Sequence, residues 1–178
     1  SGNQLFGVPG PKPTLADVPY GEHERQVLDF YQATSPEPTP VAFFIHGGGW
    51  GALDKQNVHK MLDVPKLLTN GISVAAINYR YVQQAKAAAI EPPVKWPLRD
   101  AARALQFLRS KAGDWNIDKQ RIGANGGSAG ACSSLWLALH DDMAQPNSPD
   151  PIDRESTRLC CAAVVGAQTC LDPKFMRE

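Results

Sequence analysis

Residues 121–139 read RIGANGGSAGACSSLWLAL, and within this stretch the apolar pattern changes from that of a strand to that of a helix. The residues up to Asn125 are typical of a short buried strand, and those after Ser128 of an apolar helix buried on most sides. The junction, GGSAG at 126–130, matches G-x-S-x-G, which holds a serine on a sharp turn between strand and helix. Gly126 and Gly130 have no Cβ, so other segments can pass close to the turn. The pattern predicts Ser128 as a nucleophile at the positive end of the helix, the alternative being that the glycines only permit tight packing.

A second glycine-rich segment, His46 to Trp50, follows the apolar run of residues 41–45 and contains three consecutive glycines. Glycines cost conformational entropy on folding, so three in a row indicate that the backbone N–H groups of the loop have a use. In acyl transfer, such N–H donors stabilise the oxyanion by about 3 kcal/mol each. The segment therefore predicts an oxyanion loop, the alternative being a plain flexible loop.

The rest of the chain alternates short apolar runs with longer helical periods, which indicates an α/β fold with crossover helices. We expect one domain over residues 1–178, since this length gives room for a single core. The segment 80–96 is irregular and contains Pro92-Pro93, which makes it a candidate lid over one face of the sheet. The predicted strands are residues 26–31, 41–45, 72–77, 121–125 and 160–168, and the predicted helices are residues 56–68 with a kink at Pro65, 97–112 and 129–139.

Charge and composition exclude several classes of protein. Eighteen basic and eighteen acidic side chains give a formal charge of zero, which argues against a nucleic-acid partner. The longest apolar run is far shorter than the roughly 18 residues of a membrane span. The four cysteines lack zinc spacing, so no metal is predicted; Cys160 and Cys161 are expected to be buried free thiols, with a disulfide as the alternative. Localisation stays open, because the chain does not begin with methionine.

With its two motifs the chain resembles the hormone-sensitive-lipase-like and carbohydrate-esterase-like branch of the α/β-hydrolases, which combine an H-G-G-G loop with a G-x-S-A-G elbow. Asn78-Tyr79-Arg80 and Ile117-Asp118 also look like that branch, and the likeness covers most of the chain. The resemblance implies a mostly parallel sheet with helices on both faces. It also implies hydrolysis of carboxylic esters, including small acyl esters of carbohydrates, without a cofactor. By the same resemblance Ser128 is the nucleophile, the amides of Gly48, Gly49 and Ala129 form the oxyanion hole, and His46, Gly47, Gly126 and Gly130 support the two motifs.

The catalytic base and its acidic partner are missing from this pattern. A serine needs a histidine oriented by a carboxylate, and in this fold the order along the chain is Ser, then Asp or Glu, then His. After Ser128 the only histidine is His140, no acidic residue lies between them, and roughly 18 Å of helix separates the two. His46 resembles the structural histidine of the glycine loop, not a base. We therefore expect an incomplete hydrolase domain with its C-terminal strands, acid and base beyond Glu178, and Asp172 is a weak candidate for the acid.

Two interpretations of the chain stay open. The first is the nucleophile-bearing part of a serine carboxylesterase that acts through an acyl-enzyme on Ser128. The second is a noncatalytic fragment, pseudoenzyme or binding module, which the absent base favours. Missing strands would leave an unpaired sheet edge, which predicts a homodimer through that edge. The aromatic residues near the motifs either line a substrate pocket or pack in the core; they are Trp50, Tyr79 and Tyr81.

Overall fold

A six-stranded sheet runs through the centre of the protein, in the order β1-β2-β4-β3-β5-β6. The computed structural model describes residues 10–170. Strands β4, β3, β5 and β6 are parallel neighbours; β2 pairs with β4 antiparallel, and β1 pairs with β2 antiparallel at one edge of the sheet. The strands are β1 (Leu15–Pro19), β2 (Val27–Tyr31), β3 (Thr39–Ile45), β4 (Ser73–Ile77), β5 (Ile117–Gly127) and β6 (Cys161–Val165).

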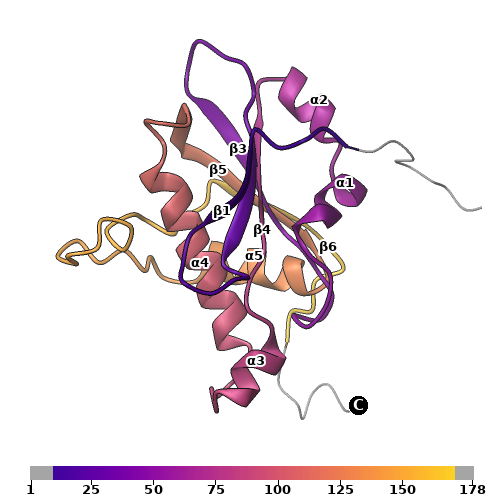
Figure 1. The fold of residues 1–178 in the computed structure, drawn as a ribbon, viewed down its shortest axis with the longest axis vertical. Helices are drawn as coiled ribbons and strands as arrows, with labels where there is room; N and C mark the ends of the chain where they lie inside the picture. Colours follow the sequence, from indigo (N-terminus) through magenta and orange to yellow (C-terminus); the bar gives the residue numbers. More distant parts are fainter. Residues whose placement is uncertain (1–9, 171–178) are drawn as a thin grey trace, which may run out of the picture.

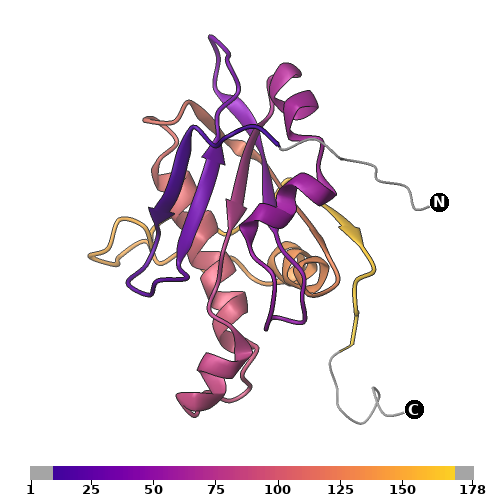
Figure 2. The same cartoon turned by 45° about the vertical axis from the view of Figure 1, so that its right-hand side comes forward.

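Helices cover both faces of the sheet. The long helix α4 (Lys95–Ser110) and the helix α5 (Ala129–Leu139) pack against the larger apolar cluster on one face. The short helices α1 (Val58–Met61) and α2 (Val64–Thr69) cover the smaller cluster on the other face. Figure 1 shows α4 and the α1–α2 pair on opposite sides of the strands, and the turned view in Figure 2 agrees. The predicted α/β architecture, a mostly parallel sheet between helices, is therefore confirmed.

The unbroken apolar runs of β3 and β4 follow from burial on both faces. Phe43 and Ile45 point into the cluster under α4 and α5, whereas Phe44 points into the cluster under α1 and α2. In β4, Val74 and Ala75 divide between the two clusters in the same way. Successive side chains of a strand point to opposite faces, so a strand covered on both sides has no position for a solvated side chain.

The register of the central strands brings the two glycine-rich segments together. Ile45, the last residue of β3, pairs with Gly126 near the end of the parallel strand β5. The loop that begins at His46 and the turn at Ser128 therefore both follow the C-terminal ends of their strands, on the same side of the sheet. The C-terminal ends of the parallel strands are where ligand sites of open α/β sheets lie.

The prediction of one kinked helix over residues 56–68 is wrong. A short 3-10 turn, Lys55–Asn57, leads into α1, and Leu62 then adopts an extended conformation that ends α1. Asp63 caps α2 by accepting a hydrogen bond from the N–H of Lys66 at 3.1 Å. Pro65 lies in the first turn of α2, where no intrahelical N–H is needed, so it helps to begin a helix instead of bending one.

The segment 80–96 is more regular than predicted. It contains the helix α3 (Val82–Ala87), and the Gln84 side chain accepts a hydrogen bond from the N–H of Tyr81 at 2.7 Å at its start. Helix α4 begins at Lys95, two residues before the predicted start at Pro97. Helix α3 and the first residues of α4 thus replace part of the expected irregular chain, and a lid role for the segment stays a prediction.

The edges of the sheet differ from the sequence prediction. Strand β1 was not predicted; it pairs with β2 across an irregularity between Leu15 and Val18. Cys160 and Cys161 are exposed free thiols with their sulfurs 3.7 Å apart, so the expectation that they are buried is wrong. Strand β6 pairs with β5 on one side, and within residues 10–170 no strand pairs with its other side. Dimer formation through this edge stays a prediction.

No helix among the described residues is long and apolar enough to cross a membrane.

The polar connection between α5 and β6 is held against α4 by ion pairs. Arg103 of α4 forms ion pairs with Asp150 at 2.6 Å and with Asp153 at 2.5 Å. These ion pairs account for two of the carboxylates in the acidic stretch that precedes β6.

Candidate active site

Ser128 lies at the tip of the turn between β5 and α5, and its side chain is exposed. Its backbone has φ 53° and ψ −120°, a conformation that a residue with a Cβ rarely adopts and that costs on the order of 1–3 kcal/mol. The surrounding hydrogen bonds hold it there: its N–H donates to the carbonyl of Val165 at 3.0 Å, and its carbonyl accepts from the N–H of Cys132 at 3.0 Å. The turn presents a hydroxyl to solvent at the N-terminal end of an apolar helix.

The glycines around Ser128 are required by close backbone contacts. A Cβ at Gly126 would lie 2.6 Å from the carbonyl carbon of Gly130 and from the carbonyl oxygen of Ile45. A Cβ at Gly130 would collide with the same Ile45 oxygen. A Cβ at Gly47 would lie 2.8 Å from the carbonyl oxygen of Gly127 and 3.6 Å from the Cβ of Ser128. The glycine loop and the serine turn therefore touch, and only residues without a side chain allow it.

The loop of residues 46–53, called the oxyanion loop below, is folded so that the amides of Gly48 and Gly49 stay free. Gly48 has φ +87° and Gly49 has φ +59°, values that favour glycine, and the N–H of Gly51 closes a turn on the carbonyl of Gly48 at 3.0 Å. Within residues 10–170, no hydrogen bond uses the N–H of Gly48 or Gly49. Ala129 is the first residue of α5, where the N–H has no partner inside the helix. These are the three amides expected to form an oxyanion hole.

Side-chain hydrogen bonds fix the oxyanion loop on the protein. The indole N–H of Trp50 donates to the hydroxyl of Ser133 on α5 at 3.0 Å, which ties the loop to the helix that follows Ser128. The hydroxyl of Tyr79 lies 2.8 Å from the carbonyl oxygen of His46 and 3.1 Å from that of Gly47, so it can donate to either at the start of the loop. The loop is thus held at its first residues and at its centre.

His46 is a buried, neutral member of the loop. Its ring stacks on the ring of Tyr79 with centroids 4.2 Å apart, and it is fully buried. Burial lowers the pKa of His46 to about 4, with Arg25 adding to the effect and the hydrogen bond of the ring to the carbonyl oxygen of Gly47 opposing it. His46 is therefore uncharged at neutral pH, and no hydrogen bond of the described residues joins it to Ser128.

Acidification is expected to destabilise the protein through His46. Below about pH 6.5 the unfolded chain binds a proton at this residue, whereas the folded protein does so only near its pKa of about 4. The free energy of unfolding should therefore fall across this window, by about 3 kcal/mol in total. Urea unfolding at several pH values measures it, and the difference between the unsubstituted protein and His46→Gln isolates this residue from the carboxylates. Parallel curves for the two proteins would contradict the prediction.

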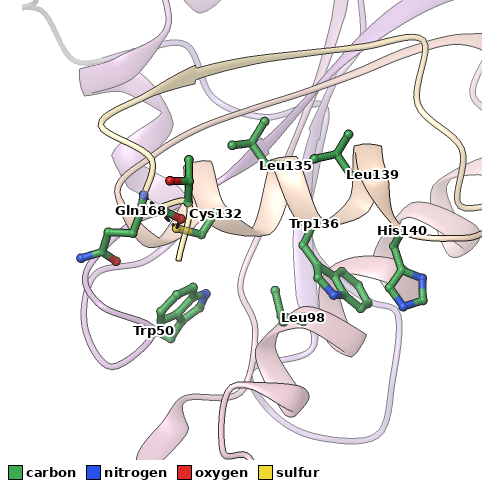
Figure 3. A pocket seen from close by; sticks show the side chains of 9 residues that line it. Trp50, Leu98, Cys132, Leu135, Trp136, Leu139, His140 and Gln168 are labelled. Carbon is green, nitrogen blue, oxygen red and sulfur yellow. Dashed lines mark hydrogen bonds between the residues drawn. The ribbon is translucent and has the colours of Figure 1, made fainter. Parts of the chain in front are cut away.

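An apolar cavity of about 390 Å³ lies beside the two motifs, along α5. Figure 3 shows Trp50, Cys132 and Gln168 near the start of the helix and Trp136 with His140 near its end. The lining residues are Trp50, Leu98, Cys132, Leu135, Trp136, Leu139, His140, Gln168 and Thr169. Of the three aromatic residues predicted near the site, Trp50 lines this cavity, Tyr79 is buried beneath His46, and Tyr81 packs against Arg25.

The described residues bring no base to Ser128. Within residues 10–170, no hydrogen bond joins a histidine to this serine. His140 forms the C-terminal cap of α5 and packs against the ring of Trp136 with centroids 4.4 Å apart, at the far end of the helix. Asp172, the weak candidate for the acid, lies outside the described residues. An acid and a base beyond Glu178 stay a prediction.

Known proteins resemble this chain in sequence and in fold. The profile of the BD-FAE family matches residues 28–177. This chain belongs to the BD-FAE family. A solved structure described as an acetyl ester-xyloside bifunctional hydrolase, from Caldicellulosiruptor lactoaceticus, superposes with a TM-score of 0.69 at 26% identity. The fold of this BD-FAE chain is therefore that of the α/β-hydrolases.

The curated relatives of the BD-FAE chain match only part of their own length. Kynurenine formamidase of Danio rerio is 43% identical over 67 residues, which is 37% of this chain and 22% of the relative. Esterase LipQ of Mycobacterium tuberculosis is 29% identical over 151 residues, which is 78% of this chain and 34% of the relative. The match to the Caldicellulosiruptor structure covers 87% of this chain and 57% of that one. The chain thus spans about a fifth to three fifths of the proteins it resembles.

Three contacts of this BD-FAE site gave no signal in the sequence. Ser133 was unremarkable in an apolar helix, yet it accepts the hydrogen bond of the Trp50 indole. Tyr79 was noted as an aromatic residue and as part of the resemblance at residues 78–80, but neither indicated that its hydroxyl contacts the start of the oxyanion loop. Arg25 was not singled out, and it contacts the backbone next to that loop. Such partners lie far apart in the sequence, so only the fold reveals them.

Proposed function

We propose that this chain carries the nucleophile and the oxyanion hole of a serine hydrolase that cleaves carboxylic esters through an acyl-enzyme on Ser128. The observation that carries the proposal is the contact between two segments: an exposed serine in a strained turn, and a glycine loop in which the Gly48 and Gly49 amides have no partner within residues 10–170. An ester carbonyl placed between them would meet the attacking oxygen and the donors for the resulting oxyanion together.

The proposed reaction follows from these groups. The Ser128 oxygen attacks the ester carbonyl carbon while a base takes its proton, and the amides of Gly48, Gly49 and Ala129 stabilise the oxyanion. Collapse of this intermediate expels the alcohol, which receives the proton from the base, and water then releases the acid by the same steps. His46 is buried and neutral, so we assign the base to a histidine beyond Glu178, oriented there by a carboxylate.

The cavity along α5 supports an ester with an apolar group of substantial size. It begins at Trp50, the residue that follows the Gly49 amide, and its walls are mostly apolar side chains. A small-molecule or carbohydrate ester fits the proposal, because the relatives include proteins named as esterases and the Caldicellulosiruptor protein is described as acting on acetyl esters and xylosides. The acyl group, the alcohol or an aromatic part of either can occupy the cavity.

Labelling with a fluorophosphonate tests the proposal in the whole protein. The reagent should modify Ser128, found by mass spectrometry in the tryptic peptide 122–154, and Ser128→Ala should remove the label. An ester that carries a phenyl ring should protect Ser128 from labelling at a lower concentration than an acetate ester without a ring, because the ring occupies the apolar cavity. Absence of label, or a label that survives Ser128→Ala, would contradict the proposal.

A noncatalytic role for these 178 residues on their own is the second candidate, favoured by the absence of a histidine bonded to Ser128 within the described residues. Removing the base of a serine triad leaves only the residual help of the oxyanion hole and of substrate binding. The 178-residue chain should therefore turn over esters far more slowly than the whole protein. Equal rates per molecule would exclude this candidate and place a base within the chain.

A further inference from the structure

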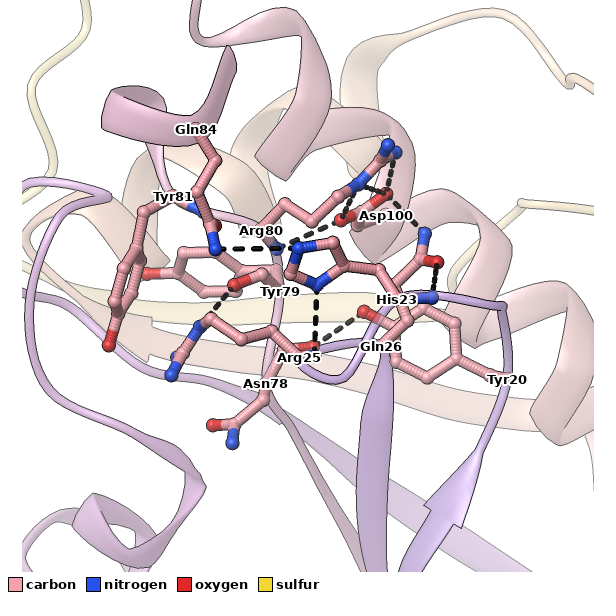
Figure 4. Close-up of polar contacts among 10 residues, drawn as sticks. All are labelled: Tyr20, His23, Arg25, Gln26, Asn78, Tyr79, Arg80, Tyr81, Gln84 and Asp100. Atoms are coloured by element: carbon pink, nitrogen blue, oxygen red, sulfur yellow. Dashed lines mark hydrogen bonds and ion pairs between the residues drawn. The ribbon is translucent and has the colours of Figure 1, made fainter. Parts of the chain in front are cut away.

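Arg25, in the turn between β1 and β2, contacts the peptide backbone at two places next to the oxyanion loop. Its Nε donates to the carbonyl oxygen of Tyr79 at 2.9 Å, and its Nη2 donates to the carbonyl oxygen of Leu53 at 3.4 Å. Its guanidinium lies over the ring of Tyr81, 3.7 Å from the ring centroid. Figure 4 shows this side chain between the turn of residues 20–26 and the segment 78–81.

Both carbonyls bear directly on the oxyanion loop. Leu53 is the last residue of the loop, and its carbonyl also accepts a hydrogen bond from the hydroxyl of Tyr81. Tyr79 contacts the first two residues of the loop through its hydroxyl, 2.8 Å from the carbonyl oxygen of His46. One guanidinium therefore holds the end of the loop and the backbone of the tyrosine that holds its beginning.

The turn that carries Arg25 is itself rigid. The N–H of Arg25 donates to Nδ1 of His23 at 3.1 Å, and the N–H of Tyr20 donates to the carbonyl of Gln26 at 2.9 Å. The Gln26 side chain donates to the buried carboxylate of Asp100 at 2.8 Å, which anchors the turn to α4. Arg25 is thus presented from a fixed platform, as a positioning group must be.

We propose that Arg25 is a positioning residue of the esterase site, which sets the placement of the Gly48 and Gly49 amides by clamping both ends of the oxyanion loop. The inference rests on the proposed function, because a misplaced amide matters only where an oxyanion forms. The planar guanidinium suits this role, since it donates from two nitrogens in fixed directions while its face covers an aromatic ring. A lysine has one flexible donor group and can do neither in the same geometry.

The test compares Arg25→Ala and Arg25→Lys in the whole protein, with Arg121→Ala as the matched control. Arg121 also donates to a backbone carbonyl, that of Pro38 at 2.9 Å, but it lies in the first half of β5, away from the turn at Ser128. Ester hydrolysis gives kcat and KM, and hydrogen exchange compares the hydrogen-bonded amide of Gly51 in the oxyanion loop with the amides of β3.

Loss of the clamp should change the loop and the chemical step, not the fold. In both Arg25 variants, exchange of the Gly51 amide, which donates to the Gly48 carbonyl at 3.0 Å, should rise roughly fivefold or more while exchange in β3 stays the same. We expect kcat to fall by about 10- to 100-fold, because small misplacements of catalytic groups have effects of this size, and KM to stay nearly constant. Arg121→Ala should leave all three quantities unchanged.

Several results would overturn the role of Arg25. Unchanged loop exchange in Arg25→Ala, full kcat in Arg25→Lys, or a uniform rise in exchange that includes β3 would each assign it to general bracing of the fold. Failure of the proposed function is distinguishable, because the unsubstituted protein would then hydrolyse no ester and take no fluorophosphonate at Ser128. The exchange comparison decides the clamp even in that case.

Discussion

Replacing Ser128 with alanine is expected to lower kcat for ester hydrolysis by the whole protein on the order of 10⁶-fold. The reason is that, in the proposed reaction, the Ser128 oxygen forms the covalent bond to the acyl group, and nothing else in the turn can replace it. The loss should appear in kcat for every ester tested, since it removes the attacking atom and no binding contact. Steady-state rates with a chromogenic ester, checked against background hydrolysis, measure it.

The fold should be indifferent to this change, because the Ser128 side chain is exposed and alanine keeps the Cβ. We expect the free energy of unfolding of Ser128→Ala to stay within about 0.5 kcal/mol of the unsubstituted protein. Ser110→Ala serves as the control, because its hydroxyl donates to the carbonyl of Phe107 at 2.7 Å at the end of α4, away from the turn. Comparable activity of the two variants would eliminate Ser128 as the nucleophile.

Gly130→Ala is expected to have the largest effect on stability, a loss of about 3 kcal/mol or more. The added methyl group would collide with the carbonyl oxygen of Ile45, which is backbone at the end of a central strand and cannot rotate away. Relief requires that α5 and β3 move apart, which disturbs the packing beneath both. Urea unfolding should show a lower midpoint, and much of the protein should be insoluble on expression.

Gly113→Ala is the matched control for this prediction. Nothing lies within 4 Å of a Cβ built at Gly113, and its backbone is outside the left-handed region. The change should therefore alter the free energy of unfolding by no more than about 0.5 kcal/mol. Equal destabilisation by the two alanines would mean that the close approach at Gly130 is not what makes this glycine necessary.

The sequence predicted the central strands and the edge strand β6, and it missed β1 at the other edge. Strands covered on both faces, such as β3, are apolar along their length. The apolar run from Val41 to Ile45 therefore indicated a central buried strand. Strand β1 has a polar residue, Asp17, with φ 51° within an irregular ladder, and alternation could not reveal it. The periodicity of residues 56–68 was compatible with one helix, because it does not register the single extended residue at Leu62.

The candidate site divides in the same way. Local motifs identified Ser128 and the glycine loop, because the chemistry requires those residue types at fixed spacings along one short segment. The partners that hold the loop come from distant segments: 83 residues separate Trp50 from Ser133, and 54 separate Arg25 from Tyr79. No periodicity or motif encodes such pairs. These two contacts can be found only in the three-dimensional structure, which brings the distant segments together.

The hydrogen bond from the N–H of Ser128 to the carbonyl of Val165 continues the ladder between β5 and β6 by one rung, into the turn itself. Ser128, the proposed nucleophile, thus forms the last backbone hydrogen bond between these two strands. A force that pulls β6 away from β5 would therefore reach the backbone of Ser128 directly through this hydrogen bond, without passing through any side chain. In a pulling experiment, the hydrogen bonds between β5 and β6 should break first at the Ser128–Val165 end, so that the proposed esterase activity is lost before the two strands separate.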